Sequence, residues 1–194
     1  VTPLEITVSA WAKSNNLTNS GSIVSKYQPA TGKNGFVIQQ SAGNMLALVG
    51  DSTGKSIVTL TGASDLNWNL WTMTFKNQVI TFYKNGVEKG TANWVGGIDS
   101  LSNHLFIGAA YRTDTTVRSG FDGSIDDVKI YSRSLSAAEV LGLYESYPPL
   151  ATKTTKSNLA SLLENIIKST VIFLASITTA IQEIIKFIFS IFIK

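Results

Sequence analysis

The sequence predicts an all-β fold, an antiparallel two-sheet jelly-roll sandwich, followed by a long α-helical, membrane-associated segment. Residues 1–147 hold short stretches of period-two alternation separated by turn residues. Residues 158–194 contain neither glycine nor proline and repeat apolar side chains at helical spacing. The character of the chain changes at Pro148-Pro149. We therefore divide the chain into a domain over 1–147, a linker over 148–157 and a helix over 158–194.

The strands are predicted from alternation. Apolar and other residues alternate over 6–11, 79–84 and 128–131. Turn signals separate these runs at 32–35, 51–54, 84–86, 95–97 and 119–123. Asn85-Gly86 is the strongest hairpin signal, because both central positions of a type I′ turn need positive φ. Many short strands at this spacing indicate a sandwich or jelly roll.

One short helix is predicted to close the domain. Ser136 is followed three residues later by Glu139, the spacing of a capping box, and apolar residues come directly after it. The strands are therefore expected to end before Ser136.

Blocks at 6–13, at 22–26, at 71–75 with 80–87, and at 105–108 with 121–136 resemble the concanavalin A-like lectin/glucanase superfamily, in its laminin-G-like branch, over about residues 4–146. The most specific block is 121–136, which begins Phe-Asp-Gly-Ser-Ile-Asp-Asp. The resemblance implies an antiparallel jelly roll used for carbohydrate or protein recognition. Members usually have a further strand upstream of the first block, so we expect that a sheet edge is left open for a neighbouring subunit.

Several of these residues also have structural interpretations. Trp11 and Trp71 are expected in or beside the core, and Phe121-Asp122-Gly123 is expected to turn the chain into the last strand.

Charge and composition narrow the function. Residues 1–150 carry eleven Lys and Arg and eleven Asp and Glu, whereas residues 151–194 carry five Lys and two Glu. The domain therefore lacks the basic footprint of a nucleic-acid-binding protein. Cysteine is absent, which excludes disulfides and thiolate chemistry. The chain begins at Val1, and we interpret this as removal of an upstream segment from a secreted protein.

An enzyme is not expected. A retaining glycosidase needs two carboxyl groups about 5–5.5 Å apart. The nearest acidic pair, Asp126-Asp127, is expected to point to opposite faces of a strand. His104 is the single histidine and is interpreted as a loop or rim residue.

Two candidate ligand sites remain in the domain. Trp94, Tyr111 and Arg112 lie at predicted loop edges, where aromatic faces and hydrogen-bonding groups could bind a glycan. Asp114 and Asp122 are the candidates for a possible calcium site, since Ca²⁺ prefers oxygen ligands. For both sets the competing interpretation is structural: Trp94 in the core, and the others in solvated loops. No other cofactor is expected.

The tail is predicted to be a helix about 55 Å long, more than a bilayer core requires. Its longest uncharged run, 169–182, is only 14 residues, so a simple single span is not assured. A polar stripe that includes Lys168, Gln182 and Lys186 lies opposite an apolar face that includes Phe173, Ile177, Ile181 and Ile188. This pattern fits a membrane bundle with a polar interior, an interfacial helix or a soluble coiled coil. The fourth alternative is that the apolar face docks on the domain or on another helix.

The sequence therefore predicts a non-enzymatic surface protein on the outer face of a membrane. Its domain would recognise a glycan or a surface protein, and its helix would contact lipid and assemble homo-oligomers. A cell envelope or the envelope of an archaeal virus would suit this design. The alternatives are a structural assembly subunit that binds no glycan, such as a ring or tail component, and, ranked below both, a glycan-active hydrolase.

Overall fold

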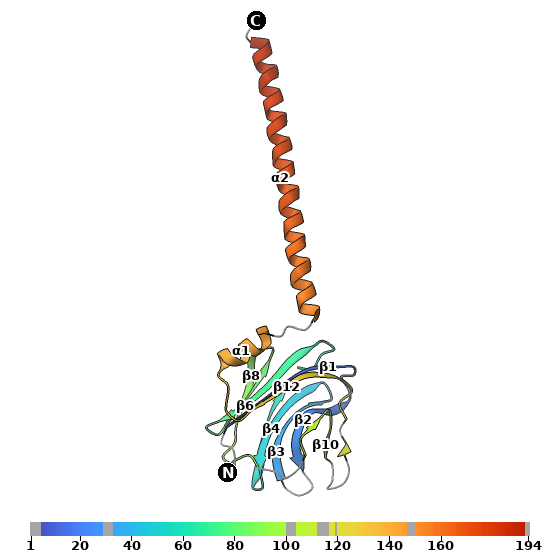
Figure 1. Ribbon diagram of the computed structural model, residues 1–194, viewed down its shortest axis with the longest axis vertical. Helices are drawn as coiled ribbons and strands as arrows, with labels where there is room; N and C mark the ends of the chain where they lie inside the picture. Colours follow the sequence, from blue (N-terminus) through green and yellow to red (C-terminus); the bar gives the residue numbers. More distant parts are fainter. Residues whose placement is uncertain are drawn as a thin grey trace. The chain divides into compact units, whose positions relative to one another are not determined.

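The computed structural model describes residues 5–28, 33–99, 104–111, 117–118, 120–146 and 150–192 (Figure 1). Contacts divide the chain into two compact units, Val1–Tyr147 and Pro148–Lys194. The strands of the first unit are β1 Ile6–Ser14, β2 Ser20–Gln28, β3 Lys33–Ser41, β4 Asn44–Asp51, β5 Gly54–Leu60, β6 Asn69–Lys76, β7 Val79–Lys84, β8 Val87–Asn93, β9 Phe106–Ile107, β10 Ala110–Tyr111, β11 Val117–Arg118 and β12 Gly123–Tyr131. Its helix is α1, Ala137–Ser146, and the second unit contains α2, Leu150–Phe192.

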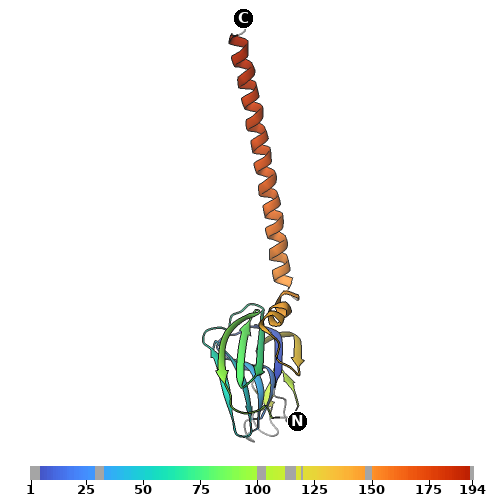
Figure 2. The same cartoon turned by 90° about the vertical axis from the view of Figure 1, so that its left-hand side faces the viewer.

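The strands form two antiparallel five-stranded sheets. The first sheet has the order β12-β1-β6-β7-β8, and the second has the order β5-β4-β3-β2-β9. The two sheets lie face to face (Figure 2). β10 and β11 pair separately as a small hairpin. The predicted antiparallel sandwich is therefore confirmed.

The core lies between the sheets and follows from alternation, because every second residue of a strand faces inward. Val8, Ala10 and Ala12 of β1 are buried there, and Thr7, Ser9 and Trp11 lie on the other face. Trp71 and Phe82 pack with ring centroids 5.7 Å apart. Trp71 is thus a core residue, as predicted.

α1 covers the outer face of the first sheet. Val140, Leu135 and Tyr83 form a second buried cluster beneath it. The rings of Tyr144 and Trp11 pack with their centroids 5.7 Å apart. Trp11 is buried, with 2% exposed, but it packs under α1 and is not in the cluster between the sheets, so it lies beside the core. This explains why both faces of β1 are buried.

The predicted capping box opens α1. The backbone N–H of Ser136 donates to Glu139 Oε2 at 2.8 Å, and the backbone N–H of Glu139 donates to Ser136 Oγ at 3.3 Å. Arg133 donates twice to the same carboxylate, at 2.7 and 3.1 Å. The Arg133 guanidinium, together with the Ser136 donors, lowers the pKa of Glu139 to about 2.

The Asn85-Gly86 turn is confirmed and supports α1. Both residues have positive φ, 55° and 79°. A Cβ on Gly86 would lie 2.8 Å from Leu141 Cδ1 and 2.9 Å from Leu141 Cα, so the absence of a side chain lets α1 approach the turn.

Replacement of Gly86 is expected to destabilise the domain. Gly86→Ala should lower the free energy of unfolding by about 1–3 kcal/mol, because alanine is strained at positive φ and would meet the α1 backbone. The matched control is Gly142→Ala within α1, where a Cβ would meet nothing within 4 Å. It should stabilise the domain by about 0.5–1 kcal/mol. Urea unfolding of the three proteins measures both effects, and equal stability of the two variants would contradict this account of the turn.

The first block of the resemblance does not lie at a sheet edge. β1 pairs with β12 on one side and with β6 on the other. The edge of this sheet on that side is therefore β12 and not β1, and pairing of an open edge with a neighbouring subunit stays a prediction. The edge strands β12 and β8 each contain a β-bulge and charged residues, features that discourage pairing with another chain.

α2 begins at Leu150, inside the predicted linker, and runs for 43 residues. The sequence prediction of a linker through 157 differs from this because it relied on polar composition. Residues 150–157 contain no glycine or proline, and a helix tolerates polar residues on its surface. Pro148 and Pro149 precede the helix, where proline does not interrupt its hydrogen bonds.

Candidate functional site

A groove lies at the open side of the sandwich, where the edge strands β5 and β8 approach each other. Its volume is about 490 Å³, within the range of small-molecule sites. The lining residues are Thr59, Leu60, Thr61, Ala63, Lys84 and Lys89. The groove is basic and has both apolar and polar lining, and no carboxylate occurs among the described residues that line it.

The backbone of β8 shapes this groove. Gly90 faces the core, where a Cβ would lie 3.1 Å from both Leu60 Cδ2 and Val58 Cγ1. Gly90 therefore lets β8 lie close to β5. The pairing of β7 with β8 shifts between Phe82 and Tyr83, so that Lys89 is the extra residue of a β-bulge. Bulges re-aim side chains at sheet edges, and here the bulge accompanies a lysine that lines the groove.

Lys84 is held in a fixed position. Its ammonium donates to Asp65 Oδ2 at 2.7 Å and to the carbonyl of Ala63 at 2.8 Å, and it lies 5.2 Å from the centre of the Trp71 ring. Burial alone would raise the pKa of Asp65, but hydrogen bonds from Lys84, Asn67 and Asn69 outweigh it and lower the pKa. Asp65 therefore stays ionised and anchors the Lys84 cation.

The predicted trio is only partly described. Trp94 is half-buried against the core, its Nε1 donates to the carbonyl of Gly97 at 2.9 Å, and a Cβ on Gly54 or Gly96 would touch its ring. This supports the structural interpretation of Trp94. The side chain of Tyr111 and all of Arg112 lie outside the described residues. Glycan binding by the trio stays a prediction.

Of the two candidate calcium residues, only Asp122 lies among the described residues. Asp122 is exposed, and its carboxylate accepts long hydrogen bonds from the amides of Asn15 at 3.4 Å and Asn19 at 3.3 Å. Asp114 lies outside the described residues. No cluster of three or more acidic, histidine or cysteine residues that could hold a metal occurs in the described part of the chain.

The acidic pair of β12 does not alternate simply, because a bulge interrupts β12 opposite Ala10 and Asp127 has a φ of 48°. The Asp127 carboxylate accepts from Lys129 Nζ at 2.6 Å, and Asp126 Oδ1 accepts from the backbone N–H of Asp127 at 2.8 Å. His104 is exposed and packs edge-on against Phe106. Asp127 is thus engaged by a cation, and His104 is an exposed residue outside the strands, which agrees with the predicted loop position.

A family model described as the concanavalin A-like lectin/glucanases superfamily matches residues 1–141. The chain belongs to this superfamily. The match covers the whole sandwich and the first half of α1, and it ends before α2. A search among curated proteins finds no significant match.

Solved structures share this lectin-like fold. The CBM40 domain of the Ruminococcus gnavus sialidase, bound to α2,3-sialyllactose, is 15% identical with a TM-score of 0.62, and the match covers 74% of this chain and 84% of that one. A serotype D botulinum neurotoxin ligand-binding domain in complex with N-acetylneuraminic acid is 20% identical (TM-score 0.53; 73% and 36% covered). The receptor-binding domain of the C/D mosaic neurotoxin is 21% identical (TM-score 0.52; 74% and 36%). The chain thus spans little more than a third of each neurotoxin domain.

The groove of this lectin-like domain was not predicted from the sequence. Its lysines lie on two strands, and the bulge at Lys89 is a feature of strand pairing. One signal was available: Gly90 stands inside a strand pattern, where an isolated glycine indicates a bulge or a close backbone approach.

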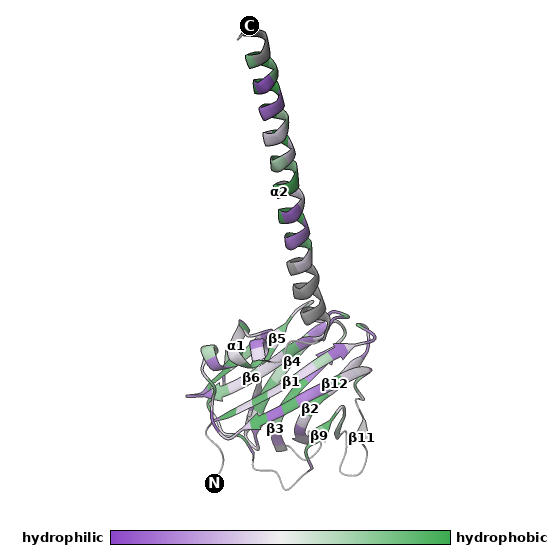
Figure 3. Ribbon diagram, turned by 45° about the horizontal axis from the view of Figure 1, so that its top comes forward, coloured by the Kyte–Doolittle hydropathy of each residue, from purple (hydrophilic) through white to green (hydrophobic). Residues whose placement is uncertain are grey.

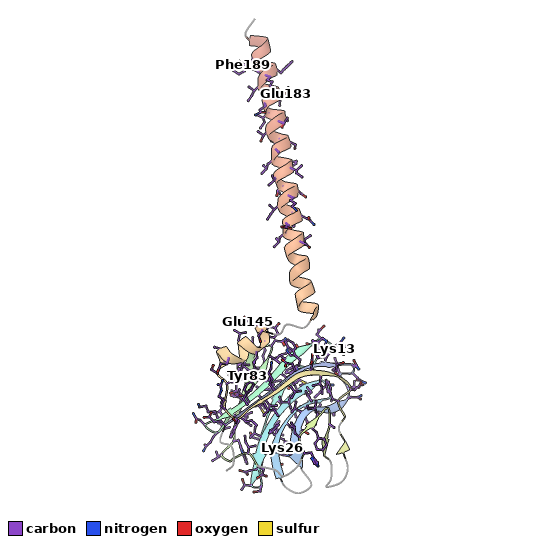
Figure 4. All side chains as sticks on the ribbon, viewed as in Figure 1. Lys13, Lys26, Tyr83, Glu145, Glu183 and Phe189 are labelled. Carbon is purple, nitrogen blue, oxygen red and sulfur yellow. The ribbon has the colours of Figure 1, made fainter. Side chains whose placement is uncertain are left out.

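Helix α2 is a second candidate functional region, besides the groove. Ser161–Phe189 is long and apolar enough to cross a membrane, and every side chain in this range is exposed. Apolar and polar positions follow one another around the helix (Figure 3), and side chains such as Glu183 and Phe189 project from it (Figure 4). The hydroxyls of Ser169, Thr170, Ser176, Thr178 and Thr179 donate to carbonyls three or four residues earlier, at 2.7 to 3.0 Å.

Local bonding reduces the polarity that α2 would bring into lipid. Hydroxyls bonded to their own helix add no unsatisfied donor in a bilayer. Lys186 Nζ lies 2.7 Å from Glu183 Oε1, so one charge offsets the other. Among the charged residues of the candidate span, Glu164 and Lys168 form no ion pair within the described residues.

Proposed function

We propose that this protein is a non-enzymatic recognition protein whose lectin-like domain binds glycans and whose α2 anchors and assembles it in a membrane. The groove between β5 and β8 carries the first part of the proposal, because it has the size, the donor groups and the apolar surface for a saccharide. Relatives in fold include a carbohydrate-binding domain with bound sialyllactose, which supports a glycan as the ligand class. The protein would be displayed on the outer face of a cell or virion envelope.

Binding without turnover is supported by the acidic side chains. Glycosidase chemistry needs one carboxyl group as acid and a second as nucleophile or base. Asp65, the carboxylate that adjoins the groove through Lys84, is held ionised by three donors and cannot serve as a proton donor near neutral pH. Asp127 is bound to Lys129. The proposed role is therefore recognition.

The membrane part of the proposal is supported by α2. Its broad apolar surface includes Phe173, Ile177, Ile181 and Ile188, and these residues would contact lipid and neighbouring helices. Lys168, Gln182 and Lys186 would face a polar interior shared by several copies. An isolated charge near the bilayer centre costs about 2.5–3.5 kcal/mol on insertion scales, which self-association would reduce.

Glycan binding is tested with the full chain in detergent on a glycan array, with and without calcium. Binding is expected in both conditions at the groove, and incubation should release no saccharide product. Binding that needs calcium would place the site at metal ligands instead. If incubation releases a saccharide product, and Asp126→Asn or Asp127→Asn abolishes that release, the hydrolase alternative would be restored. A stable oligomer that binds no glycan would select the structural assembly subunit.

A further inference from the structure

We infer that the groove between β5 and β8 selects saccharides that carry an anionic group, a carboxylate or a sulfate ester, and that Lys89 is the residue that selects them. This inference rests on the proposed function and adds the chemical class of the ligand. It is carried by the charges of the groove and by the bulge that brings Lys89 into it.

The two lysines have different roles. Lys84 is bound to Asp65 and to the Ala63 carbonyl, so its charge is largely balanced and its position is fixed. Lys89 is exposed, and no ion pair or hydrogen bond of its ammonium is found within the described residues. The unbalanced positive charge of the groove is therefore that of Lys89. An anion that binds beside it gains a charge-assisted hydrogen bond.

Neighbouring acidic groups do not cancel this charge. Asp65 is engaged by Lys84, Asn67 and Asn69. Glu88 precedes Lys89 but is paired in register with Tyr83, which lies under α1 on the other face of the sheet. Burial is the main cause of the raised pKa of Tyr83, and the negative charge of Glu88 adds to it. This agrees with a position of Glu88 beside Tyr83. Glu88 does not line the groove.

The other lining groups fit a sugar rather than a small inorganic ion. Thr59 and Thr61 are exposed and offer hydroxyls, and Leu60 and Ala63 add apolar surface. A volume of about 490 Å³ exceeds what one sulfate or phosphate ion needs. Hydroxyl donors, an apolar floor and one unbalanced cation together match a saccharide ring with a single acidic substituent.

The test compares 3′-sialyllactose, 3′-sulfolactose and lactose as ligands of the full chain in detergent. Both acidic sugars should bind more tightly than lactose. Lys89→Ala should weaken the acidic sugars roughly 10- to 100-fold, as expected for loss of a charge-assisted hydrogen bond, and should weaken lactose, which has no anionic group, several-fold less. The matched control is Lys13→Ala, which removes the same charge from an exposed position outside the groove and should change affinity less than about threefold.

Each outcome separates the inference from the proposed function. Equal affinity for lactose and the acidic sugars would overturn the inference and leave glycan binding standing. No binding of any of the three sugars or of array glycans would overturn both. Competition by inorganic sulfate as strong as that by 3′-sulfolactose would show an anion site without sugar recognition. Circular dichroism of the variants checks that they remain folded, and Lys89→Arg, which keeps the charge, should retain most of the affinity.

Discussion

Truncation after Tyr147 is expected to yield a soluble, β-rich monomer, whereas the full chain is retained in membranes and forms oligomers in detergent. The buried core of the domain consists of residues of the first unit, and every described side chain of α2 is exposed. Removal of the helix therefore takes away apolar surface without opening the core. Membrane flotation and light scattering of the two proteins measure the difference.

A second variant separates retention from assembly. Lys186→Leu keeps the apolar helix and removes one charge of the polar stripe, so retention in membranes should persist while the oligomer changes. An insoluble or unfolded truncation would show that α2 belongs to the core. A full-length chain that stays monomeric and partitions into buffer would contradict the membrane part of the proposal.

Phe82→Ala is expected to lower the free energy of unfolding of the domain by about 3–5 kcal/mol. Phe82 is fully buried between the sheets and packs against Trp71. Its truncation loses the transfer free energy of the ring and leaves a cavity that rigid sheets close only in part. Chemical unfolding of the truncated domain, followed by tryptophan fluorescence, gives the value.

The matched control for Phe82 is Leu66→Ala. Leu66 is 51% exposed in the loop before β6, so its truncation should change stability by no more than about 0.5 kcal/mol. A loss below about 1 kcal/mol for Phe82→Ala, or a similar loss for both variants, would contradict a single core formed between the two sheets.

Most of the fold was predictable because its signals are local. Alternation in residues 6–11 gave the buried face of β1, Asn85-Gly86 gave the β7–β8 hairpin, and the Ser136–Glu139 spacing gave the start of α1. The order of the strands in each sheet was harder to predict. The placement of β12 beside β1 depends on pairing between residues more than 100 positions apart, and nothing in the sequence near β1 encodes it.

The candidate site was less predictable than the fold. Trp94 was selected for its aromatic ring, but a ring on a loop edge can equally fill space, and here it packs against the core and bonds to Gly97. Lys89 stands in an unremarkable charged stretch, and its orientation depends on a bulge set by the register with β7. Helix α2 was found from composition, but its start was misplaced because polarity alone does not end a helix.

The most direct test of the central claim is capture of vesicles by immobilised glycan. The full chain is reconstituted into vesicles and passed over beads coated with 3′-sialyllactose or with lactose. The sialyllactose beads should retain the vesicles, soluble 3′-sialyllactose should release them, and protein truncated after Tyr147 should bind the beads without retaining vesicles. Vesicles that carry the protein but pass both columns, with the truncated protein also unbound, would contradict the claim that this domain recognises glycans at a membrane.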